Sequence, residues 1–112
     1  MQSIKVGICA LFLFNVHAYA EDLNEKVARN AANCLTGHVA TNSAAFQAGD
    51  TSKYVFLIEE ILGSAKASSA IQDASQKLDS AVRMLGSTKK EEGEFLISKF
   101  CAAINEIIAS RS

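Results

Sequence analysis

The chain contains no proline in 112 residues and is rich in alanine, serine, leucine and glutamate. Proline disrupts helices more than any other residue, whereas alanine, leucine and glutamate favour them. The composition therefore predicts an all-α protein. The chain is long enough for one small domain but not for two domains of ordinary size.

The first 20 residues have the three parts of a secretory signal peptide. Lys5 supplies the positive charge, residues 6–16 form the apolar run, and Ala18-Tyr19-Ala20 is a pattern that signal peptidases cleave. A membrane anchor is the alternative, but the run has about half of the roughly 20 apolar residues that span a bilayer. We therefore expect a cleaved signal peptide over 1–20 and a mature domain over 21–112. That domain would be periplasmic or secreted, with no membrane span after cleavage.

Apolar spacing and end signals divide the mature domain into helices. Glycine can supply the left-handed turn that ends a helix, and a capping box can begin one. A buried strand over 54–58 is the alternative for the third segment. The expected segments are a helix from the capping box Asp22-Leu23-Asn24-Glu25 to Gly37, a short turn from Asn42 that stops at Gly49, a helix from Asp50 or Thr51 to Gly63, a helix over 65–85, and a helix over 89–109.

The segment 65–85 has the most regular pattern. Its apolar residues recur at alternating intervals of four and three, which is the seam of a helix packed nearly antiparallel on a neighbour. Gly86 ends this helix, and the capping box Thr88-Lys89-Lys90-Glu91 begins the next. Since short links between helices favour antiparallel neighbours, we expect an up-and-down bundle of four to five helices. The seam consists of Ala67, Ile71, Ala74, Leu78, Ala81 and Leu85.

Cys34 and Cys101 are the two cysteines of the mature domain, and they lie on the apolar faces of its first and last predicted helices. An even pair in an oxidising compartment predicts one disulfide. Closing the 66 residues between them would stabilise the fold by roughly 4 kcal/mol in loop-closure entropy. Two buried thiols are the alternative.

The sequence offers little catalytic chemistry. His38 follows Cys34 by four residues, but zinc needs three or four ligands and the mature domain has no other histidine. A disulfide would also leave no thiol nucleophile at Cys34. Neighbouring carboxylates such as Glu91 and Glu92 fit a solvated first turn of a helix. We therefore expect no enzyme activity, no cofactor, no metal ion, and a surface position for His38.

The surface of the predicted bundle points instead to an interaction protein. The near-neutral charge, with 11 basic and 12 acidic residues, argues against nucleic-acid binding. Ser68 and Ser75 belong to a narrow small-residue face that would admit a partner helix or a second copy of the chain, and ordinary helix surface is the alternative. Phe46 and Tyr54 are candidate aromatic anchors, with Tyr54 expected to be partly exposed.

Three functions fit this outline. In size, export signal and helical content the chain resembles periplasmic immunity proteins, which neutralise a toxic effector. An inhibitor of this kind is the leading expectation. Small acid-stress chaperones of the periplasm resemble the chain too. The third is a carrier whose interior holds a small apolar ligand. The phenylalanines expected to line that interior are Phe46, Phe56, Phe95 and Phe100.

Overall fold

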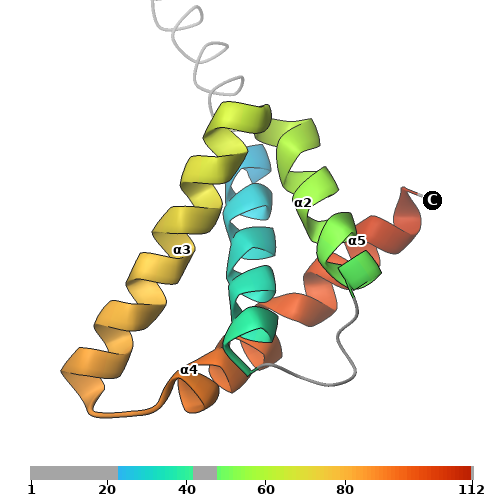
Figure 1. Ribbon diagram of the computed structural model, residues 1–112. Coiled ribbons are helices and arrows are strands. Elements are labelled where there is room, and N and C mark those ends of the chain that lie inside the picture. Colours follow the sequence, from blue (N-terminus) through green and yellow to red (C-terminus); the bar gives the residue numbers. More distant parts are fainter. Residues whose placement is uncertain (1–22, 42–47, 112) are drawn as a thin grey trace, which may run out of the picture.

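The computed structural model describes residues 23–41 and 48–111, and all of this part of the chain folds into helices and their links (Figure 1). The predicted signal peptide, the first capping residue Asp22 and Phe46 lie outside the described residues. None of the described helices is both long and apolar enough to cross a membrane. The helices are residues 23–41; α2, Ala48–Leu62; α3, Ser64–Leu85; and a last helix made of α4, Lys89–Leu96, the π-helical segment η1, Ile97–Cys101, and α5, Ala102–Ser110.

The first three of these helices run in alternating directions, and the last crosses the C-terminal end of the first at an oblique angle (Figure 1). The described residues therefore confirm an all-α fold, with four helices. The helix over 23–41 lies between the others (Figure 1), and three of its seven buried residues are alanines, which let neighbouring helices approach closely. The core consists of Ala28, Ala31, Ala32, Cys34, Leu35, Tyr54, Leu57, Ile58, Ala67, Ala74, Cys101 and Ile104.

Several predicted helix ends are confirmed. Gly63 and Gly86 have φ values of 85° and 66°, the left-handed backbone that glycine adopts without a Cβ penalty. The capping box at the start of α4 is complete: the Thr88 hydroxyl accepts from the Glu91 amide, and the Glu91 carboxylate accepts from the Thr88 amide. These ends depend on residues a few positions apart.

Other predicted ends are wrong. Helix α2 begins at Ala48 rather than at Asp50 or Thr51, so Gly49 lies inside a helix and ends no turn. The seam of α3 is correct at Ala67, Ala74 and Leu78, which are buried, but Leu85 is 71% exposed. Ala81 is half-buried and residues 83–85 are exposed, so the last turn of α3 lies outside the core.

Gly37 does not end the first helix, which continues to residue 41. It is buried at the crossing with α4, where a Cβ atom on Gly37 would lie 2.8 Å from the carbonyl oxygen of Gly93. The first helix thus uses this glycine for close approach to another backbone rather than for a turn.

The π-helical segment η1 brings two residues of the last helix, Gly93 and Cys101, to the side that faces the first helix. Cys101 follows Gly93 by eight residues. A regular α-helix, at about 100° per residue, would place them roughly 80° apart around the helix axis. A π turn accommodates one additional residue and reduces this to roughly 20°. Both residues can therefore face the same neighbour, the helix over 23–41.

Candidate functional site

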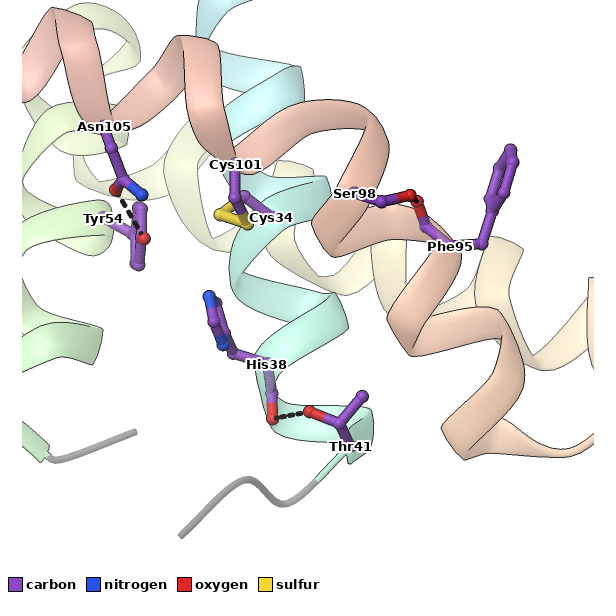
Figure 2. Close-up of a disulfide and its surroundings, with 8 residues drawn as sticks. All are labelled: Cys34, His38, Thr41, Tyr54, Phe95, Ser98, Cys101 and Asn105. Carbon is purple, nitrogen blue, oxygen red and sulfur yellow. Dashed lines mark hydrogen bonds between the residues drawn. A yellow bond between two sulfur atoms is a disulfide. The ribbon is translucent and has the colours of Figure 1, made fainter. Parts of the chain in front are cut away.

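The Cys34–Cys101 disulfide joins the first helix to the end of η1 (Figure 2). The two Cα atoms are 5.0 Å apart, and both side chains are buried. This confirms the predicted pairing. His38 lies on the same face of the first helix as Cys34, one turn closer to the C-terminal end of that helix (Figure 2).

Tyr54 packs beside this disulfide and is only 2% exposed, so the prediction of a partly exposed tyrosine is wrong. Its hydroxyl donates a 2.7 Å hydrogen bond to the side-chain oxygen of Asn105 on α5. Tyr54 shares the buried face of α2 with Leu57 and Ile58, at the three- and four-residue spacing of one helix face. The Tyr54 ring therefore lies in the core rather than at the surface.

His38 is half-buried rather than on the surface. Its ring points toward the disulfide (Figure 2) and stacks on Tyr54, with ring centroids 6.0 Å apart. A ring nitrogen of His38 and the sulfur atoms of Cys34 and Cys101 all lie within 4.8 Å of one another. The Cys34–His38 spacing is visible in the sequence, but the prediction set it aside, because it counted only histidines as further ligands and expected Gly37 to end the first helix. A helix that continues past Gly37 keeps His38 on the Cys34 face.

A surface groove between α2 and α5 is a second feature, which we call the Phe56 groove. It encloses about 570 Å³. Phe56 is 68% exposed beside it, and the Arg111–Glu60 ion pair, with N–O distance 2.7 Å, spans its two helices. The groove thus combines an exposed aromatic ring with charged groups. It is lined by Ser52, Lys53, Phe56, Leu57, Glu60, Ile108 and Arg111.

A third feature is a cleft of about 450 Å³ between the first helix and α3, which we call the Ser75 cleft. Its apolar lining includes Leu35, Val55, Ile71 and Leu78. The Lys89–Asp79 ion pair, at 3.6 Å, borders it. Ser75 is exposed at this cleft, and Ser68 is exposed elsewhere on α3, so both candidate partner-binding serines are accessible.

The phenylalanines of the carrier hypothesis do not gather inside the described part of the chain. Phe56 and Phe95 are exposed, and Phe100 is half-buried. The Nζ atom of Lys99 lies 5.6 Å from the Phe95 ring centroid and 5.4 Å from that of Phe100. The interior predicted for an apolar ligand is therefore not formed by these three rings.

Several carboxylates of the described helices have structural partners. Glu91 belongs to the capping box, and Glu92 accepts a 2.6 Å hydrogen bond from Ser87. Asp73 pairs with Lys77 within one exposed helix face.

Comparisons of the chain with protein-family models, with curated proteins and with solved structures found no match.

Proposed function

We propose that the chain is a small exported helical protein that binds a partner protein through the Phe56 groove. The observation that carries this proposal is the exposure of Phe56, a large aromatic side chain, at a groove with charged walls. Aromatic residues and arginine are enriched at interface centres, and a polar rim usually surrounds them. Phe56, Lys53 and Arg111 match this composition.

We infer the kind of partner from the predicted export signal and from the lack of catalytic motifs in the sequence. A dedicated inhibitor or immunity protein binds one effector at a fixed stoichiometry, and we favour this role. A stress chaperone would instead hold many proteins weakly. A second copy of the chain would occupy the same groove in a homodimer.

Affinity capture tests the proposal. The oxidised protein is immobilised and exposed to the extracytoplasmic fraction of cells that produce it, beside the variants Phe56→Ser and Phe95→Ser. Phe95 is a matched control, because it is also an exposed helical phenylalanine, at 55%. We expect one protein to be retained by the wild type and by Phe95→Ser but not by Phe56→Ser. Titration calorimetry with the purified partner should then show the same order of affinities.

Two results would contradict this proposal. Equal retention by both variants would exclude the Phe56 groove as the docking site. Retention of many proteins in small amounts would favour the chaperone role over the inhibitor role.

The Ser75 cleft favours a second candidate, a carrier of a small apolar ligand. Its apolar lining and its volume of about 450 Å³ are within the range of small-molecule sites. An apolar fluorescent dye should bind once per chain, and Ser75→Phe should block it by filling the cleft. Ser68→Phe, which adds the same ring elsewhere on α3, should leave dye binding unchanged. Dye binding that survives Ser75→Phe would exclude the cleft.

A further inference from the structure

We propose that Cys34, Cys101 and His38 form a binding site for a zinc-class metal ion when the disulfide is reduced. The first helix supplies Cys34 and His38 one turn apart, and η1 supplies Cys101 from the opposite side (Figure 2). The three ligand atoms already lie within 4.8 Å of one another. This inference is independent of partner binding at the Phe56 groove.

The ligand set has the chemistry that zinc prefers. Two thiolates and one imidazole leave a fourth tetrahedral position for water. Bonds of about 2.3 Å to sulfur and 2.0 Å to nitrogen place ligand atoms roughly 3.5–4 Å apart. Once the disulfide is broken, the two sulfur atoms therefore need to move apart to these distances. The imidazole nitrogen, within 4.8 Å of both sulfur atoms, needs to approach them by only about 1 Å.

The surroundings suit a buried cation. Cys34 and Cys101 are 0% and 5% exposed, so two thiolates there would be costly without a positive partner. The Tyr54 ring stacks on His38 and is itself held by the hydrogen bond to Asn105, which limits rotation of the imidazole. A pocket of about 550 Å³ lined by His38, Glu94 and Ser98 reaches the imidazole from solvent.

Reduction and metal binding are separate steps. A dithiol reductant transfers two electrons and two protons to the disulfide, the S–S bond breaks, and the reductant becomes a disulfide. The two cysteines are then thiols. The metal ion replaces both thiol protons, which pass to solvent, and forms two metal–sulfur bonds and one metal–nitrogen bond. The disulfide and the metal site therefore exclude each other.

Cobalt(II) is the probe, because its visible spectrum reports tetrahedral thiolate coordination. The protein is reduced with dithiothreitol, freed of reductant without oxygen, and titrated with cobalt(II) alone. We expect thiolate-to-cobalt charge transfer and intense d–d bands that saturate at one ion per chain, and no such bands for the oxidised protein. His38→Gln should weaken binding at least about tenfold, by analogy with the loss of groups that support metal ligands. Thr41→Ala, at the same pocket, should not change it.

The His38→Gln comparison keeps the test decisive even if reduction loosens the fold. Thiols in an unfolded chain would bind cobalt whether or not His38 is present. Equal affinities for the reduced wild type and His38→Gln would therefore overturn the proposal, as would the absence of saturable cobalt bands in the reduced wild type. Cys34→Ser should lose the charge-transfer intensity of one thiolate, and unchanged intensity would also count against the site.

Discussion

Gly37 and Gly93 bring the backbones of the first and last helices into direct contact. A Cβ atom on either glycine would lie 2.8 Å from the carbonyl oxygen of the other. Neither oxygen can rotate away as a side chain can, so a larger residue at either position would push the two helices apart. The same two helices are joined by the Cys34–Cys101 disulfide.

Gly37→Ala should destabilise the protein although alanine is the better helix former. Helix propensity alone would add about 1 kcal/mol to the free energy of unfolding. Overpacking at the crossing typically costs 1–3 kcal/mol, and contact with backbone favours the upper end. We expect a net loss of about 1–2 kcal/mol, measured by urea unfolding. Ala103→Gly, exposed on α5, is the control for propensity and should lose about 1 kcal/mol. A Gly37→Ala variant with a higher free energy of unfolding than the wild type would contradict the close contact between Gly37 and Gly93.

Deletion of Ser98 should be tolerated because η1 contains one residue more than a regular α-helix needs. Without Ser98, Cys101 would follow Gly93 by seven residues, and roughly 20° would separate them in an uninterrupted α-helix. The disulfide should form, and the free energy of unfolding should change by about 1 kcal/mol or less.

Deletion of Ala103 provides the matched comparison. It would rotate the buried Ile104 by about 100° relative to Cys101 and remove it from the core, which costs about 2–5 kcal/mol. Thiol titration and urea unfolding of both deletion variants measure the difference. Equal losses for the two deletions would show that η1 does not set the register.

The double variant Cys34→Ser, Cys101→Ser should lower the free energy of unfolding by about 2–4 kcal/mol, because the disulfide limits the freedom of the unfolded chain. Urea unfolding measures this loss, and wild type in dithiothreitol is the control for the serine hydroxyls. A loss below about 1 kcal/mol would mean that the disulfide contributes little to folding.

The hydrogen bond between Tyr54 and Asn105 should appear as a coupling energy between α2 and α5. Tyr54→Phe removes the donor and leaves the Asn105 oxygen without this partner, at a cost of about 0.5–1.5 kcal/mol. A double-mutant cycle with Asn105→Ala should give a coupling above about 0.5 kcal/mol. Additive losses would show that the bond does not contribute to stability.

Local signals in the sequence predicted several features correctly. Gly63, Gly86 and the box from Thr88 to Glu91 act on backbone groups within a few residues, so the chain needs no distant partner to set them. The cysteine pairing also followed from the sequence: with Cys9 assigned to the predicted signal peptide, Cys34 and Cys101 remain as one possible pair.

The candidate sites depended on partners that the sequence does not reveal. Tyr54 and Phe56 are two residues apart, and their aromatic side chains gave no sign of which one faces the core. The packing of α2 on the first helix and α5 buries Tyr54 and leaves Phe56 exposed. The sequence-based prediction placed His38 on the surface because it counted no second histidine ligand, assigned Cys34 to a disulfide and expected Gly37 to end the helix.

By itself, the sequence determined that the described chain is helical, where α2 and α3 end, and which cysteines pair, because these depend on propensity, nearby capping groups and cysteine count. Only the tertiary structure decided that Gly37 serves a crossing rather than a helix end, and that His38 and Tyr54 lie beside the disulfide. A glycine permits both a turn and a close approach. Which one occurs depends on a backbone more than 50 residues away, here that of Gly93.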